Sequence, residues 1–95
     1  MKYAVIVGYI FEGEAQEHLE GVYTNYLEAY GKAYLVLNDV IRDENAVDAT
    51  ISQPKELNSG EGYILRILNA CDLDDYAKIF IRDDEDDAKR KSRWE

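Results

Sequence analysis

The sequence contains few of the residues that build covalently or metal-stabilised folds, and it lacks the patterns that direct a chain into a membrane. It has a single cysteine, Cys71, which excludes an internal disulfide and a four-cysteine zinc site and favours a reducing compartment. No apolar run approaches the roughly 20 residues that span a bilayer, and the first ten residues lack the small-residue cleavage site of a signal peptide. We therefore expect a cytoplasmic protein without membrane contact.

Side chains suited to catalysis are also scarce. The only histidine, His18, lies in a polar stretch with no serine or second histidine to complete a catalytic group. Cys71 has an acidic neighbour, Asp72, and no basic one, so it lacks the electropositive surroundings of a nucleophilic thiol. We expect it to be a buried or half-buried structural residue. The sequence predicts no enzyme activity, no metal site and no cofactor.

Basic residues are few over most of the chain. Twenty Asp and Glu against eleven Lys and Arg give a net charge of −9. Up to Asp87 there are 19 acidic and 7 basic residues, a net charge of −12, whereas residues 88–95 carry four basic and one acidic residue. A body of this sign repels nucleic acid and anionic membranes and attracts basic protein surfaces. The alternative is that the acidity only keeps a small protein in solution.

A strand-to-helix corner at residues 21–30 organises the rest of the chain. Val22 and Tyr23 favour an extended backbone, and Asn25 with Glu28 forms an Asn-x-x-Glu capping box, which predicts a helix from Tyr26 to Arg42. Apolar residues recur at three- and four-residue steps and should form one wide face, made of Leu27, Tyr30, Ala33, Tyr34, Leu37, Val40 and Ile41. Leu35 and Val36 lie outside this face and could form a second contact surface. Gly31, inside the helix, indicates close backbone packing.

Strands are expected at residues 2–11, 19–24, 46–52, 63–69 and 76–82, with polar connections at 12–18 and 55–62. The first strand is apolar on both faces and should be central, and Gly8 within it predicts a bulge or a close approach by the helix. In the last strand Ala77, Ile79 and Ile81 should point inward, and Phe80 outward with Lys78 and Arg82.

Length and element order together predict the fold class. Ninety-five residues with 46% apolar content suffice for one core. We expect a single α+β domain over residues 1–95, an antiparallel sheet of about four or five strands with one main helix on one face. Residues 83–95 form a charged C-terminal tail that is either a short helix or disordered.

The opening KYAVIVGYIFEGEAQEHLEGVYTNYLEAYGKAY carries a resemblance. With its Gly-Val-Tyr corner and the Ala29 and Ala33 that follow, it resembles small uncharacterised domains of bacteriophages and prophages. In those domains a strand ends in Gly-Val-Tyr or Gly-Val-Phe, and a helix rich in Glu and Ala follows. The resemblance covers about the first forty residues. It implies an α+β fold and a phage origin, and it carries over no activity and no functional residues.

Carboxylates recur in short rows along the chain. Alternate strand residues lie about 6.6 Å apart and helical i,i+4 neighbours about 6 Å apart, close to the spacing of phosphates along a nucleic-acid strand. Carboxylates fixed in this way can imitate a phosphate track, although solvated loops are the alternative. The predicted partner-binding residues are Asp72, Asp74, Asp75, Phe80, Asp83, Asp84, Glu85, Asp86 and Asp87.

Two functions therefore compete. The first is a non-enzymatic acidic binding protein, a phage-encoded inhibitor of a host nucleic-acid-handling defence protein of the anti-CRISPR or anti-restriction type. It would act as a DNA mimic on a basic host protein surface, without contacting nucleic acid itself. The alternative is a structural or regulatory module that self-associates, for instance as a homodimer, and whose acidity is only solvating.

Overall fold

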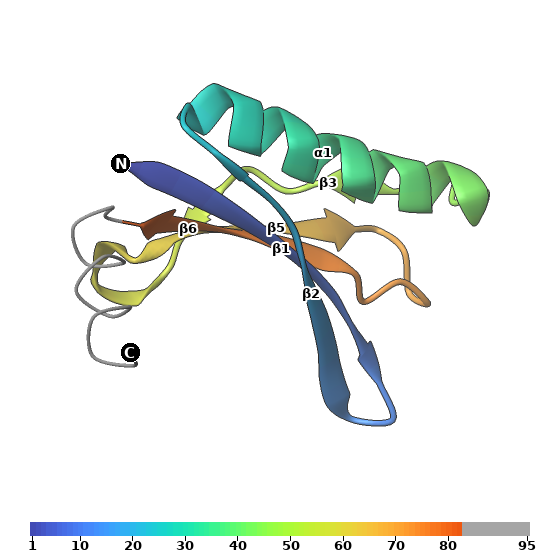
Figure 1. The fold of residues 1–95 in the computed structure, drawn as a ribbon. Helices are drawn as coiled ribbons and strands as arrows, with labels where there is room; N and C mark the ends of the chain where they lie inside the picture. Colours follow the sequence, from blue (N-terminus) through green and yellow to red (C-terminus); the bar gives the residue numbers. More distant parts are fainter. Residues whose placement is uncertain (83–95) are drawn as a thin grey trace.

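The computed structural model describes residues 1–82, and the expectations for residues 83–95 lie outside this range. One helix lies across one face of an antiparallel sheet (Figure 1). The elements in chain order are β1 (Lys2–Phe11), β2 (Glu14–Tyr23), α1 (Tyr26–Asp43), β3 (Thr50–Ile51), β4 (Lys55–Glu56), the short 3₁₀ helix η1 (Asn58–Gly60), β5 (Gly62–Leu68) and β6 (Tyr76–Arg82). The predicted α+β class, with one main helix on one sheet face, is confirmed.

The strands follow the order β2-β1-β6-β5-β3, with β4 also paired to β5, and every pair is antiparallel. β1 lies between β2 and β6, so the prediction of a central first strand is confirmed. β2 is a long strand at one end of the sheet, whereas the other end carries only the two-residue strands β3 and β4.

The predicted polar connection at residues 12–18 is wrong, because β2 already begins at Glu14. The turn needs only Glu12 and Gly13, which both have positive φ, 52° and 82°. Such a two-residue turn matches the twist of the flanking strands. Cross-strand hydrogen bonding to β1 therefore holds residues with low strand propensity in an extended conformation.

The β1–β2 pairing contains one irregularity. Val5 lies opposite Gly21, but Ile6 lies opposite Leu19, so Glu20 is an extra residue in β2. A bulge of this kind changes which side chains share a face. As a result Leu19 and Val22 both point away from α1, opposite Ile6 and Ala4 respectively.

The helix begins where the sequence predicts. The Asn25 side chain accepts hydrogen bonds from the backbone N–H groups of Leu27 at 2.7 Å and Glu28 at 3.4 Å. These bonds satisfy two amides that have no partner inside the helix. The cap therefore fixes the corner between β2 and α1.

The face that α1 buries is the predicted one over Tyr30, Ala33, Leu37, Val40 and Ile41, but it also includes Ala29 and Val36 and excludes Leu27 and Tyr34. Ala29, Ala33 and Leu37 are fully buried, whereas Leu27 is 73% exposed and Tyr34 is also exposed. The periodicity of large apolar side chains predicted burial of Leu27 and Tyr34. Instead, the small side chain of Ala29 is buried and lets the helix lie close to the sheet. The prediction for Gly31 is wrong as well, since a Cβ placed there would meet no atom within 4 Å.

The core lies between α1 and the sheet. Its largest fully buried side chains are Val5 of β1, Leu37 of α1, Leu65 of β5 and Ile79 of β6. Burial of each contributes about 1.5–3 kcal/mol to the free energy of unfolding. Ala77 and Ile79 face the helix as predicted, and Phe80 faces away from it.

Four tyrosine rings pack together at the edge of the core, near the first turn of α1. The rings of Tyr3 and Tyr63 lie 5.8 Å and 5.3 Å from the ring of Tyr26, centroid to centroid, and Tyr30 follows at 6.2 Å. Burial, together with the neighbouring tyrosines, raises the pKa of Tyr26. These rings are interface residues between helix and sheet.

The segment before β5 has less strand at residues 46–52 and more regular structure at residues 55–62 than predicted. The predicted strand at 46–52 is reduced to β3, and the predicted loop at 55–62 contains β4 and η1. At the start of β5, Gly62 presses against β6: a Cβ at this position would lie 1.9 Å from the carbonyl oxygen of Ile79. Only glycine lets the two strands approach so closely.

Two glycine substitutions should therefore have opposite effects on stability. Gly31→Ala should raise the free energy of unfolding by about 0.5–1 kcal/mol, because the position is helical and open. Gly62→Ala should lower it by about 3 kcal/mol or more, because the methyl group meets rigid backbone. Urea denaturation of the two variants beside the parent chain measures both. Equal effects at the two sites would contradict the packing described above.

Candidate binding surfaces

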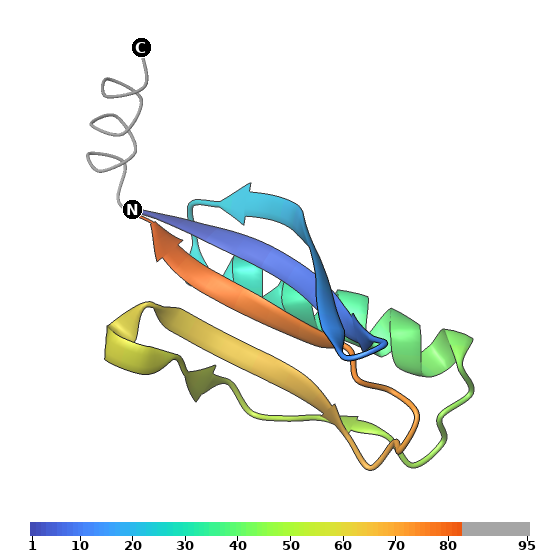
Figure 2. The ribbon, with the colours of Figure 1, turned by 90° about the horizontal axis from the view of Figure 1, so that it is seen from below.

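One face of the sheet is not covered by any described element. α1 lies on the opposite side, and Figure 2 looks onto the uncovered side with the helix behind the strands. Because paired residues in antiparallel strands share a face, the register identifies the side chains that lie there. We call this surface the open face; it comprises Lys2, Ala4, Ile6, Gly8, Glu17, Leu19, Val22, Lys55, Ile64, Arg66, Leu68, Tyr76, Lys78, Phe80 and Arg82.

Tyr76 is the centre of the open face. Its side chain is 4% exposed, and its ring lies over Gly8 of β1, where a Cβ would come within 2.7 Å of the ring. The predicted close approach at Gly8 is therefore real, but it comes from Tyr76 and not from the helix. The phenol reaches across β1 and donates a hydrogen bond to the Glu17 carboxylate of β2.

Two cations complete this cluster. Lys78 Nζ lies 3.2 Å from Glu17 Oε2, and both Lys78 and Arg66 lie over the Tyr76 ring, at 5.4 Å and 5.8 Å from its centroid. The hydrogen bond from Tyr76 lowers the pKa of Glu17, partial burial opposes this, and Lys78 adds to the lowering. Burial, followed by the Glu17 carboxylate, raises the pKa of Tyr76 to about 12. The cluster ties β2 to β6 across β1.

Beside this cluster is an apolar groove of about 530 Å³. We call it the apolar groove; its lining is Ala4, Ile6, Leu19, Glu61, Phe80, Ile81 and Arg82. A smaller hollow of about 260 Å³ lies on the same face, which we call the cationic hollow; its lining is Ser52, Gln53, Lys55, Ile64, Arg66 and Leu68. The open face thus combines apolar surface with positive charge.

A second surface has the opposite sign. The end of α1 and the connection between β5 and β6 bring together five carboxylates, which we call the acidic end: Glu44, Asp48, Asp72, Asp74 and Asp75. Three of them border a hollow of about 290 Å³ whose lining includes no Lys or Arg among the described residues. Val47 stands at its rim, 96% exposed.

The charges at the acidic end act on one another. Burial raises the pKa of Asp75, a backbone hydrogen bond opposes this, and the negative charges of Glu44 and Asp74 raise it further. A cation brought against this end would reverse the last effect. Cys71 borders the same hollow and is exposed, so the prediction of a buried or half-buried thiol is wrong. It lies in a loop outside the helix–sheet interface, which leaves it open to solvent.

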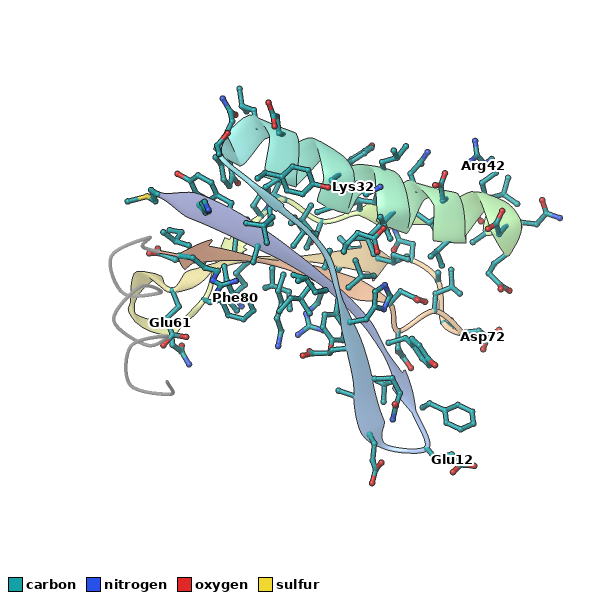
Figure 3. All side chains as sticks on the ribbon, in the orientation of Figure 1. Glu12, Lys32, Arg42, Glu61, Asp72 and Phe80 are labelled. Carbon is teal, nitrogen blue, oxygen red and sulfur yellow. The ribbon has the colours of Figure 1, made fainter. Side chains whose placement is uncertain are left out.

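The predicted partner-binding residues divide between surfaces. Asp72, Asp74 and Asp75 lie together at the acidic end, whereas Phe80 lies on the open face beside the apolar groove. Figure 3 shows Asp72 and Phe80 well apart, and Glu12 separately at the tip of the β1–β2 hairpin. The carboxylates of residues 1–82 therefore do not form one continuous face. Asp83, Asp84, Glu85, Asp86 and Asp87 lie outside the described residues.

Sequence reasoning missed the Tyr76 cluster and the cationic hollow. Tyr76 and Glu17 are 59 positions apart, and their contact depends on the strand order. The one available signal was the alternation of Tyr76, Lys78 and Phe80 along a strand whose other face is apolar. That pattern identifies an exposed sheet face but not its partners.

Comparison with known proteins finds no matching family model, no matching curated protein and no matching solved structure. The resemblance to phage domains therefore stays a prediction. Within residues 1–82, no helix is long and apolar enough to cross a membrane, and no three His, Cys, Asp or Glu side chains are grouped so that they could hold a metal ion.

The bond between Tyr76 and Glu17 should be measurable as a coupling energy. In a double-mutant cycle of Tyr76→Phe and Glu17→Gln, urea denaturation at pH 7 should give a coupling of about 1 kcal/mol, since Glu17 is partly exposed. The folded-state pKa of Glu17 lies below its ordinary value of 4.5, so the coupling is fully present above pH 4.5. It should be lost as the pH falls through the lowered pKa. A coupling that is absent at pH 7 would disprove the bond.

Proposed function

We propose that the protein is a non-enzymatic binding protein whose acidic end docks on a cationic surface of another protein. The observation that carries this proposal is the group of five carboxylates at the acidic end, three of which border a hollow without a described Lys or Arg in its lining. Uncompensated charges of one sign attract the opposite sign and speed encounter with it. Exposed Val47 at the rim supplies an apolar contact inside the charged area.

In its specific form, the partner is a nucleic-acid-handling defence protein of a bacterial host, and the chain is a phage-encoded inhibitor of the anti-CRISPR or anti-restriction type. The cationic channel of such a protein binds phosphates, and clustered carboxylates compete for the same cations. The gathering of carboxylates at one end favours a compact cationic patch as the target. An extended, DNA-like row would need residues 83–87 in addition.

Loss of charge at the acidic end should weaken capture of a basic partner. Asp72→Asn with Asp74→Asn removes two exposed charges at this end and should reduce capture from a bacterial lysate by about threefold to tenfold at low salt. Quantitative mass spectrometry of proteins retained by the tagged chain gives the readout. High salt should weaken capture by the parent chain, because the contact is electrostatic.

The matched control is Glu12→Gln with Glu14→Gln, which removes the same charge at the hairpin tip. This variant should retain capture within about twofold, since only the net charge changes. Retention that does not respond to salt, or an equal loss in both variants, would refute docking through the acidic end.

Self-association is the second candidate function, and the outer side of α1 favours it. Leu27, Tyr34 and Leu35 are exposed there, at positions that share one side of the helix, and Gly31 between them leaves room for close approach. An apolar stripe of this kind on a surface helix is a common contact between protein chains. The acidity would then serve only for solubility.

Sedimentation velocity at two protein concentrations tests this candidate. If the chain self-associates through α1, its sedimentation coefficient should rise with concentration and be insensitive to salt. Leu35→Lys should abolish the rise, whereas Gln16→Lys, an equal charge change on exposed β2, should not. A monomer at both concentrations would eliminate self-association.

A further inference from the structure

The basic residues of this acidic chain are not spread evenly. Among the Lys and Arg side chains of residues 1–82, only Lys32 and Arg42 lie on α1, and each pairs with a carboxylate, Glu20 at 3.7 Å and Asp39 at 2.5 Å. The others, Lys2, Lys55, Arg66, Lys78 and Arg82, all lie on the open face. Within residues 1–82, the open face therefore carries more basic than acidic side chains, with Glu17 paired to Lys78, on a protein whose net charge is −9.

Two of these cations lack a carboxylate partner among the described residues. No described Asp or Glu lies within ion-pair distance of Lys55 or of the Arg66 guanidinium, and both border the cationic hollow. Ser52 and Gln53 add polar side chains to its lining, and the Ser52 hydroxyl oxygen accepts the Arg66 backbone N–H at 2.9 Å. The cationic hollow thus presents two positive charges without a carboxylate partner in residues 1–82, beside hydrogen-bonding groups, as a carboxylate requires.

The apolar groove lies two strands away. Ile64, at the cationic hollow, is opposite Lys78, and Lys78 is opposite Ile6, which lines the apolar groove. Neighbouring strands are about 4.8 Å apart, so the two sites are separated by about 10 Å across the sheet. An extended chain covers this distance in about three residues, at about 3.3 Å per residue.

We propose that the open face binds an extended acidic peptide segment of another protein. One apolar side chain of the segment enters the apolar groove, and a carboxylate about three residues away binds Lys55 and Arg66. Lys78 lies between the two sites. This surface is distinct from the acidic end and takes a partner of the opposite charge, so it does not depend on the function proposed above.

A peptide fits this surface better than a nucleic acid does. Stacking of bases needs exposed aromatic rings, but Tyr76 is buried, with Gly8, Arg66 and Lys78 against its ring. A nucleic acid strand would also extend its charge beyond the open face, where the net charge of −9 repels it. An acidic segment of a few residues stays within the cationic surface.

Fluorescence anisotropy with a labelled eight-residue peptide tests the proposal. The probe carries one Leu and, three positions later, two Glu in a Gly and Ser background, and it is titrated with the full chain at low salt. Lys55→Gln with Arg66→Gln should weaken binding at least about fivefold. Lys32→Gln with Arg42→Gln removes the same charge from α1 and should leave binding within about twofold. Replacing Leu in the probe by Ser should weaken binding as well.

The single variant Lys55→Gln controls for misfolding of the double variant. Lys55 is exposed in a two-residue strand, so its replacement should not disturb the fold, whereas Arg66 contacts Tyr76. It should weaken binding by at least about threefold with an unchanged melting temperature. Three outcomes would overturn the proposal: unaltered binding in Lys55→Gln, an equal loss in the Lys32 and Arg42 control, or tighter binding of an eight-nucleotide oligo-dT than of the peptide. The last would identify the open face as a nucleic acid site.

Discussion

The packing of a single helix against a single sheet face determines what the rest of the molecule can do. Ala29 and Ala33 are small enough to bring α1 close to Val5 and Ile79, and this contact forms most of the core. Residues 1–82 contain no second α-helix to place on the other side. They therefore leave a whole sheet face in contact with solvent, which a core-forming sequence would ordinarily cover.

The open face is stabilised by other means than burial under a helix. The Tyr76 side chain packs against Gly8 and connects three strands through its hydrogen bond to Glu17, while Lys78 and Arg66 lie over its ring. The same side chains that hold the strands together give the face its charge. Acidic residues are concentrated at the end of α1 and in the β5–β6 connection, so the molecule presents two surfaces of opposite sign.

Local signals in the sequence were sufficient for much of the fold. The Asn25 cap, the extent of α1 and the central place of β1 depend on neighbours in the chain, and all three were predictable. Most of the buried face of α1 was predictable too, but the burial of Ala29 and the exposure of Leu27 and Tyr34 were not, because apolar periodicity does not show how closely a helix approaches a sheet. In the candidate site, the grouping of Asp72 to Asp75 follows from adjacency, whereas the position of Phe80 beside the apolar groove requires the sheet register.

β2 has a further consequence, because it is ten residues long and pairs with a neighbour on one side only within residues 1–82. Glu14, Glu17 and Glu20 place negative charge along it, and such charge discourages another chain from adding as a further strand. A substitution that removed this charge would leave the edge of β2 open to pairing with another copy of the hairpin.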